Sequence, residues 1–160
     1  MNPIAESFVA VLKALHEHEV EYVLIGGLAV SFHDIARVTK DIDIFVKRTP
    51  ENFAKLRQAL RAVFADEAIA EITHEELEKY PVLRYGTPAN YYIDVLDRIG
   101  EAFSYEDLKY EVIMSPGFPV RVATMDTLIK LKEGTLRPRD HMDVAYLIEK
   151  MQEKKKNAGL

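Results

Sequence analysis

The sequence has no cysteine, no long apolar run and no excess of positive charge, and each absence excludes a class of protein. Without cysteine, the 160 residues cannot form disulfides, thiolate zinc sites, iron–sulfur clusters or a cysteine nucleophile. No run approaches the roughly 20 apolar residues that span a bilayer. The N-terminal stretch has no basic region, and charged residues interrupt its apolar positions. We therefore expect neither a signal peptide nor a membrane span, and we expect a cytoplasmic protein.

The charge balance is acidic. The 21 Lys and Arg residues against 26 Asp and Glu residues give a formal net charge of −5. A field of this sign does not favour nucleic acid or anionic membranes in general. Any binding of phosphate must therefore come from a local cluster of basic residues or from a metal ion. The composition is otherwise ordinary for a soluble protein, with 48% hydrophobic and 29% charged residues.

Hydrophobic periodicity and turn residues predict a protein that mixes strands and helices. Short β-rich runs predict strands at residues 21–25, 41–46, 82–85, 91–96, 111–114 and 120–123. Helical patterns and caps predict helices at 5–19, 28–33 and 75–79, from Thr49-Pro50 onward, from Thr124 to Gly134, and from Arg137-Pro138 onward. The last helix is expected to bury Val144, Leu147, Ile148 and Met151.

This pattern predicts an α/β (α+β) fold with a mixed β-sheet flanked by helices. The length suits one domain over residues 1–160, with a core at about 20–123 and a closing pair of helices at about 124–152. The acidic segment at 65–80 is either a lid or a surface excursion, and the sequence leaves both alternatives open.

A glycine pair followed by two spaced aspartates is the most informative feature. Gly26-Gly27 follows an expected strand, so backbone without side chains can approach a phosphate there, beside a helix N-terminus. Asp41 and Asp43 are two apart on an expected strand, which places both carboxylates on one face. Close carboxylates repel each other unless a cation lies between them. Because Mg²⁺ binds carboxylates together with substrate phosphates, the segment indicates phosphoryl or nucleotidyl transfer.

A third aspartate interrupts an otherwise apolar and aromatic strand. An ionised Asp94 in the middle of the run at 91–96 would be costly if it were buried without a partner. A metal site shared with Asp41 and Asp43 would give it one. Taken singly, such aspartates and a glycine pair after a strand have common structural explanations. Their combination, in this order and on these elements, favours a catalytic site.

In this order, the motifs resemble the minimal nucleotidyltransferases of the DNA polymerase β-like superfamily, in particular the small branch associated with abortive infection and toxin–antitoxin systems. That family has a glycine pair or Gly-Ser, then two aspartates one residue apart, then a third Asp on a later strand. Gly26, Gly27, Asp41, Asp43 and Asp94 match this pattern in order. The closing stretch, with a Lys-bearing helix and a helix that starts at R-P-x-D, also resembles that branch. The resemblance covers roughly residues 20–150.

The resemblance implies a nucleotidyl transferase fold and transfer of an NMP group from an NTP, ATP or another nucleotide, to an acceptor hydroxyl. Asp41 and Asp43 would bind two Mg²⁺ ions, with Mn²⁺ as a substitute, that bridge the triphosphate. Asp94 would bind the catalytic ion and help to deprotonate the attacking hydroxyl. The backbone of Gly26-Gly27 would hold the β- and γ-phosphates.

Several polar residues around these motifs have two interpretations. Lys130 and Lys132, with Arg137 and Arg139, form either a phosphate-binding patch or a solvated helix face, and only one of the two lysines is expected to face the site. Arg37 could contact phosphate or offset the charge of the aspartates. Thr39 stands near the position at which many members have serine before the first Asp.

Four ring-bearing residues also have a catalytic and a structural interpretation. His33 is more simply a structural histidine than a catalytic base. Tyr85, Tyr91 and Tyr92 could stack on a base or an acceptor, although half-buried strand tyrosines are commoner.

The sequence is compatible with more than one acceptor. The acceptor is a protein or tRNA target in a toxin–antitoxin or defence system, or a small molecule as in antibiotic adenylyltransferases. A third alternative is a non-catalytic, antitoxin-like binding protein with the same fold. A toxin or antitoxin partner, or a second copy of the chain, is compatible with each. The acidic net charge disfavours a long nucleic-acid footprint.

Overall fold

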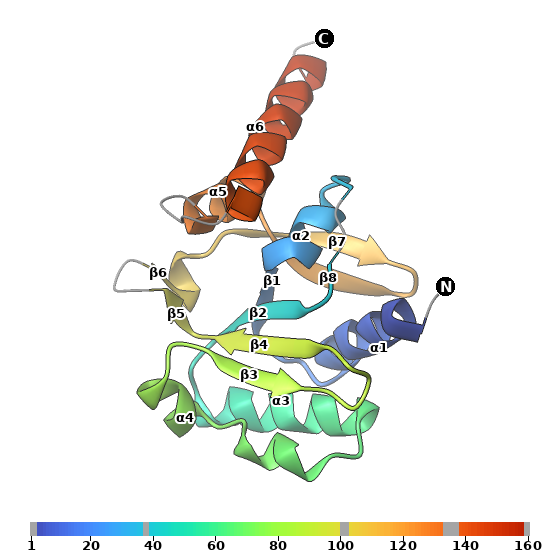
Figure 1. The fold of residues 1–160 in the computed structure, drawn as a ribbon, viewed down its shortest axis with the longest axis vertical. Coiled ribbons are helices and arrows are strands. Elements are labelled where there is room, and N and C mark those ends of the chain that lie inside the picture. Colours follow the sequence, from blue (N-terminus) through green and yellow to red (C-terminus); the bar gives the residue numbers. More distant parts are fainter. Residues whose placement is uncertain (1–2, 37–38, 100–102, 133–137, 159–160) are drawn as a thin grey trace.

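A six-stranded mixed sheet in the order β3-β4-β2-β1-β8-β7 forms the centre of the molecule (Figure 1). The computed structural model describes residues 3–36, 39–99, 103–132 and 138–158. The strands of this sheet are β1 (Tyr22–Ile25), β2 (Ile42–Val46), β3 (Leu83–Gly86), β4 (Tyr92–Leu96), β7 (Tyr110–Ser115) and β8 (Phe118–Ala123). Strand β2 runs parallel to β4, and β1 runs parallel to β8, whereas the other neighbouring pairs are antiparallel.

Helices and smaller elements surround this sheet. The helices are α1 (Pro3–Glu17), α2 (Gly26–Phe32), α3 (Pro50–Val63), α4 (His74–Lys79), α5 (Met125–Lys132) and α6 (Pro138–Ala158), with short 3₁₀ helices η1 (Glu67–Glu71) and η2 (Tyr105–Asp107). Strands β5 (Arg98–Ile99) and β6 (Phe103–Ser104) form a separate two-stranded ribbon. The predicted mixed α/β fold is therefore confirmed, and strand ends differ from the predicted ones by one or two residues.

The two faces of the sheet have different chemistry. By strand alternation, one face carries fully buried residues such as Leu24, Ile44 and Val95, which are register neighbours. This face packs on the layer of α1 and α3, where Phe8 of α1 contacts the ring of Tyr91 with centroids 4.8 Å apart. The opposite face carries the polar residues of β2, β3 and β4. The core layer with α1 and α3 therefore lies on one side of the sheet, and the aspartates lie on the other, together with the buried side chain of Phe45 and helix α2.

Helix α2 begins on the glycine pair itself, and not after it as the sequence suggested. Ile25 ends β1 in an extended conformation and serves as the N-cap, and Gly26 has a φ of +73°. A positive φ is readily adopted by glycine, so the chain can turn from strand into helix within one residue. This turn brings the start of α2 next to β2.

The predicted start of α3 is confirmed. The Thr49 hydroxyl accepts a hydrogen bond from the backbone N–H of Asn52 at 3.1 Å, and Pro50 occupies the first helical position. Phe53, Leu56 and other apolar residues of this helix are buried in the core.

The two C-terminal helices α5 and α6 pack on each other, and α6 extends away from the sheet (Figure 1). Leu147 is fully buried and Met151 packs against the core, as predicted. The prediction for Ile148 is wrong, because its side chain is 42% exposed. Successive helical positions point about 100° apart, and a projecting helix has only a narrow contact stripe. Gly134 and the side chain of Val144 lie outside the described residues.

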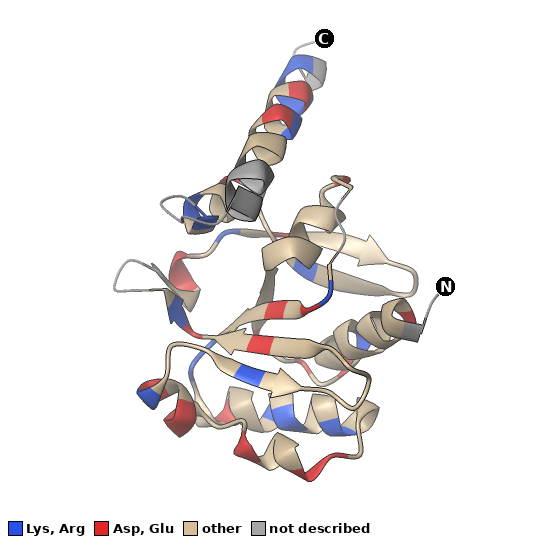
Figure 2. Cartoon of the chain, in the orientation of Figure 1, with Lys and Arg blue, Asp and Glu red and all other residues tan. Residues whose placement is uncertain are grey.

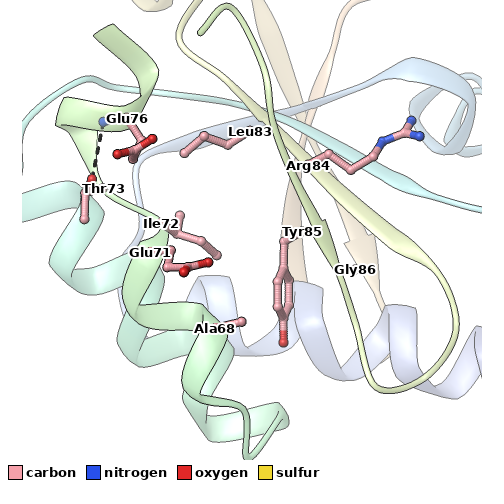
Figure 3. A pocket seen from close by; sticks show the side chains of 9 residues that line it. All are labelled: Ala68, Glu71, Ile72, Thr73, Glu76, Leu83, Arg84, Tyr85 and Gly86. Atoms are coloured by element: carbon pink, nitrogen blue, oxygen red, sulfur yellow. Dashed lines mark hydrogen bonds between the residues drawn. The ribbon is translucent and has the colours of Figure 1, made fainter. Parts of the chain in front are cut away.

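The acidic segment at 65–80 is packed along the edge strand β3. Ile69 and Leu77 are fully buried, and the Arg57 guanidinium donates a hydrogen bond to the carbonyl of Ile72 at 2.8 Å. A cavity of about 620 Å³ lies between residues 68–76 and β3 (Figure 3). The predicted short helix is present as α4. In the described ranges, none of the helices is both long enough and apolar enough to cross a membrane.

Candidate active site

Asp43 and Asp94 lie side by side on the parallel strands β2 and β4. They are direct register partners, and a hydrogen bond joins their side chains. Figure 2 shows these acidic positions on adjacent strands, with a basic position on β3 beside them. Burial is the main reason that the pKa of Asp43 rises to about 7, and the charge and hydrogen bond of Asp94 and the charge of Asp41 add to it.

The backbone of Gly26 closes one side of this pair. A Cβ atom on Gly26 would lie 2.1 Å from Oδ2 of Asp43, which is far inside van der Waals contact. Only glycine therefore lets the carboxylate of Asp43 approach the first residue of α2 this closely. Gly27 follows in the first turn and is partly exposed. The first glycine of the pair and the carboxylate of Asp43 are therefore direct neighbours.

Asp41 lies one residue before β2 and shares the sheet face of Asp43 through their two-residue spacing. Its Oδ1 accepts a hydrogen bond from the backbone N–H of Tyr92 at 3.0 Å, across to the first residue of β4. This bond orients one oxygen. The side chain is partly exposed. Asp41 is thus tied to the same pair of strands as Asp43 and Asp94.

Asp94 is also bound by an arginine that the sequence analysis did not identify. Arg84 of β3 is the register partner of Asp94, and its Nε and one terminal nitrogen donate to the two carboxylate oxygens at 3.0 and 3.1 Å. The guanidinium also lies over the ring of Tyr92, 4.5 Å from its centroid. The only signal in the sequence was a basic residue inside the predicted strand 82–85. Its pairing with Asp94 depends on the register of a hairpin.

The chemistry of the donors suits a hard divalent cation, although the three carboxylates are not yet arranged around one. Carboxylate oxygens are the preferred ligands of Mg²⁺, and the raised pKa of Asp43 reflects first its burial and then the acidic groups held close to it. Among the residues that the structure describes, no three His, Cys, Asp or Glu side chains form a ready metal-binding group. In this arrangement, both oxygens of Asp94 engage Arg84 and one oxygen of Asp41 engages Tyr92.

The two lysines of α5 diverge, as their spacing predicted. Lys132 is buried, with 8% exposure, and its charge lowers the pKa of Asp43, so it lies on the side of the aspartates. Lys130 is exposed, and its charge acts on Asp126 of its own helix.

The remaining members of the predicted set are Thr39 and three arginines. Thr39 lies just before β2 and is partly buried. Arg37 and Arg137 lie outside the described residues, as does the side chain of Arg139.

The histidine and two of the tyrosines have structural roles. His33 is buried, and its Nε2 donates to a backbone carbonyl of β8 at 2.8 Å, in agreement with the simpler interpretation. Tyr85 and Tyr91 are buried in the core, and each hydroxyl forms a 2.7 Å hydrogen bond with another side chain. Tyr92 is 45% exposed and lies on the face of the aspartates.

Several solved structures share the fold of this chain. The lincomycin-bound lincosamide antibiotic adenylyltransferase LnuA matches with a TM-score of 0.55 at 14% identity, over 89% of this chain and 94% of that one. The solution structure of the antibiotic-resistance factor ANT(2'')-Ia matches with a TM-score of 0.56 at 14% identity, over 96% and 92%. JHP933 from Helicobacter pylori matches with a TM-score of 0.52 at 16% identity, over 91% and 65%. At these identities the likeness shows the fold alone.

Sequence comparison is more specific. No curated protein matches the chain. The family model described as the nucleotidyl transferase AbiEii toxin of type IV toxin–antitoxin systems matches residues 10–158, which is nearly the whole chain. The resemblance drawn from the glycine and aspartate motifs is thereby confirmed. The chain belongs to the AbiEii family and is a nucleotidyltransferase.

Proposed function

We propose that the protein transfers an NMP group from an NTP to the hydroxyl of a protein or tRNA target in a toxin–antitoxin system, with Mg²⁺ held by Asp41, Asp43 and Asp94. The observation that carries this proposal is the contact between Asp43 and Asp94 beside the open backbone of Gly26. Membership in a toxin–antitoxin family supports the choice of target.

The reaction is an in-line displacement at the α-phosphorus. The acceptor oxygen forms a bond to that phosphorus, the bond to the β-phosphate bridging oxygen breaks, and pyrophosphate leaves. Bound Mg²⁺ would supply charge neutralisation at the attacking and leaving oxygens. Asp94 would take the proton of the acceptor hydroxyl, and Asp41 and Asp43 would hold the cation.

Backbone and lysine groups would bind the triphosphate. The partly exposed backbone of Gly26-Gly27 lies next to Asp43, and neither glycine has a side chain of its own to keep phosphate oxygens away. Lys132 is buried on the side of the aspartates and would add a positive charge there. Lys130, Arg37 and Thr39 stay predictions as nucleotide-binding residues.

A labelling assay tests the proposal. The purified protein is incubated with each α-labelled NTP, Mg²⁺ or Mn²⁺, and tRNA, a protein extract or lincosamide and aminoglycoside antibiotics as acceptors. We expect labelling of tRNA or protein, and a loss of about 100-fold or more with Asp43→Asn. Asp107→Asn is the matched control, because Asp107 is an exposed carboxylate that caps η2 through Ser104. Equal labelling by wild type and Asp43→Asn would contradict the proposal, and labelling of the antibiotics alone would move the acceptor to the small-molecule class.

The role of the glycine pair has its own matched control. Gly26 and Gly117 both have a positive φ, +73° and +93°, but a Cβ would meet Asp43 at Gly26 and nothing within 4 Å at Gly117. Both Gly→Ala variants should therefore lose about 1 kcal/mol to backbone strain. Only Gly26→Ala should also displace Asp43 and lower the transfer rate, by about 10-fold or more. Equal transfer rates for the two variants would show that the close approach has no part in the reaction.

A further inference from the structure

Arg84 occupies the carboxylate that the proposed function assigns to the catalytic ion. It donates to both oxygens of Asp94, at 3.0 and 3.1 Å, in a two-pronged contact. A planar guanidinium matches a carboxylate in this geometry better than any other side chain does. A cation that uses either oxygen of Asp94 must therefore share it with Arg84 or displace it.

We propose that Arg84 is a positioning residue that holds Asp94 in the metal-free protein and competes with the divalent cation for its carboxylate. The inference rests on the proposed function, because it takes Asp94 as a ligand. Strand β3 is an edge strand and carries none of the family's aspartates. Through Arg84, it would directly influence how tightly the site binds its cation.

The surroundings of Arg84 allow it to release Asp94. The Arg84 side chain is 57% exposed, while that of Asp94 is only 12% exposed. Figure 3 shows the Arg84 side chain pointing away from residues 71–76, which line the same cavity. The guanidinium also contacts the ring of Tyr92, which is itself exposed. A guanidinium with this much water around it can leave a carboxylate at small cost.

Release would not remove the positive charge from the site. The side chain starts from a strand position directly opposite Asp94, and the exposed face of Tyr92 lies beside it. Cation–π contact with that ring can hold the guanidinium after the carboxylate is lost. Arg84 can thus stay on the same face of the sheet through a ring contact that it already makes.

Binding of Mn²⁺ without nucleotide tests the competition. The spectroscopic signal of free Mn²⁺ in electron paramagnetic resonance is titrated against wild type, Arg84→Ala, Arg84→Lys and Arg61→Ala, an exposed position on α3. We expect Arg84→Ala to bind Mn²⁺ about 10-fold more tightly. Arg84→Lys should also bind more tightly, by a few-fold, because lysine keeps the charge but lacks the two-pronged contact. Arg61→Ala should match wild type.

The lysine variant separates competition from simple charge repulsion. If Arg84→Lys binds Mn²⁺ like wild type while Arg84→Ala binds more tightly, charge repulsion accounts for the effect and the inference fails. Unchanged affinity in both variants also overturns it. Adding Asp43→Asn distinguishes this failure from that of the proposed function: Mn²⁺ binding that Asp43→Asn abolishes, but that neither Arg84 variant changes, contradicts only the role of Arg84. Absence of Mn²⁺ binding in every variant contradicts the proposed metal site and this inference together.

Discussion

Strand β4 carries one aspartate in its middle and another just beyond its end, and the two have very different surroundings. The side chain of Asp97 has no exposure and is held by two arginines, Arg48 and Arg98. Arg98 also donates to the carbonyl of Leu77 in α4 at 2.6 Å. Asp94 is held by one largely exposed arginine and faces a second carboxyl group.

The difference separates a structural charge from one that is available for chemistry. A carboxylate buried with two cationic partners is already neutralised, and its ion pairs connect the ends of β2 and β4 to α4. A carboxylate that is pressed against another acidic group and only loosely paired gains from a further cation. The same segment of chain therefore supplies a structural aspartate at Asp97 and, under the proposed function, a metal ligand at Asp94.

The largest effect should come from replacing the loosely paired aspartate. Asp94→Asn keeps the shape and one acceptor oxygen but removes the charge that would hold the cation and accept the proton. We expect NMP transfer to fall by about 1000-fold, while the unfolding free energy changes by less than about 1 kcal/mol. Transfer rates and urea unfolding of the same preparation measure both quantities. A variant that keeps its activity would place the proposed base and ligand elsewhere.

Asp97→Asn should show the opposite pattern, with a large loss of stability and little change in transfer activity. It leaves two arginines without their shared carboxylate, and removing one partner of a buried ion pair costs about 3–5 kcal/mol. Because Arg48 and Arg98 keep partial access to water, we expect a somewhat smaller cost, about 2–4 kcal/mol. Transfer per folded molecule should stay at the wild-type level at a temperature where both proteins are folded. Strong loss of activity in a folded Asp97→Asn variant would remove the distinction between the two aspartates.

Much of this comparison could be predicted from the sequence, and part of it could not. The spacing of Asp41 and Asp43 and the interruption of a strand by Asp94 were enough to bring three carboxylates to one face, because strand alternation is a local property. The arginines that pair with these aspartates were harder to predict. Arg84 meets Asp94 through the register of a hairpin, and Arg48 meets Asp97 across 49 residues of chain.

Two predictions about the helices were wrong because they also depended on the tertiary structure. Hydrophobic periodicity located the last helix but predicted a buried face that was too wide and included Ile148. Periodicity does not show how far a helix extends beyond the sheet on which it packs. The sequence predicted that α2 begins after the glycines. The helix begins on Gly26 instead, because Gly26 adopts a positive φ that only the folded backbone reveals.

The pH dependence of stability provides the last and smallest test. The pKa of Asp43 is about 7 in the folded protein against 3.8 in the unfolded chain, mainly because the group is buried. Since the folded state binds this proton more tightly, the stabilisation by protonated Asp43 is fully present below about pH 4 and is lost as pH rises through about 7. A shift of this size corresponds to at most about 4 kcal/mol, and we expect about 1–3 kcal/mol because the group keeps some access to water.

Asp43→Asn should therefore flatten the loss of stability between about pH 4 and 7, and should make the metal-free protein more stable than wild type above pH 7. Urea unfolding with EDTA at a series of pH values measures this difference. The sign of the change in unfolding free energy is decisive, because removal of the charge is expected to stabilise the protein at Asp43 but to destabilise it at Asp97. If Asp43→Asn were instead less stable than wild type at pH 8, the charge at Asp43 would already be neutralised within the protein. The site would then resemble the ion pairs of Asp97, and it would have no need of a bound cation.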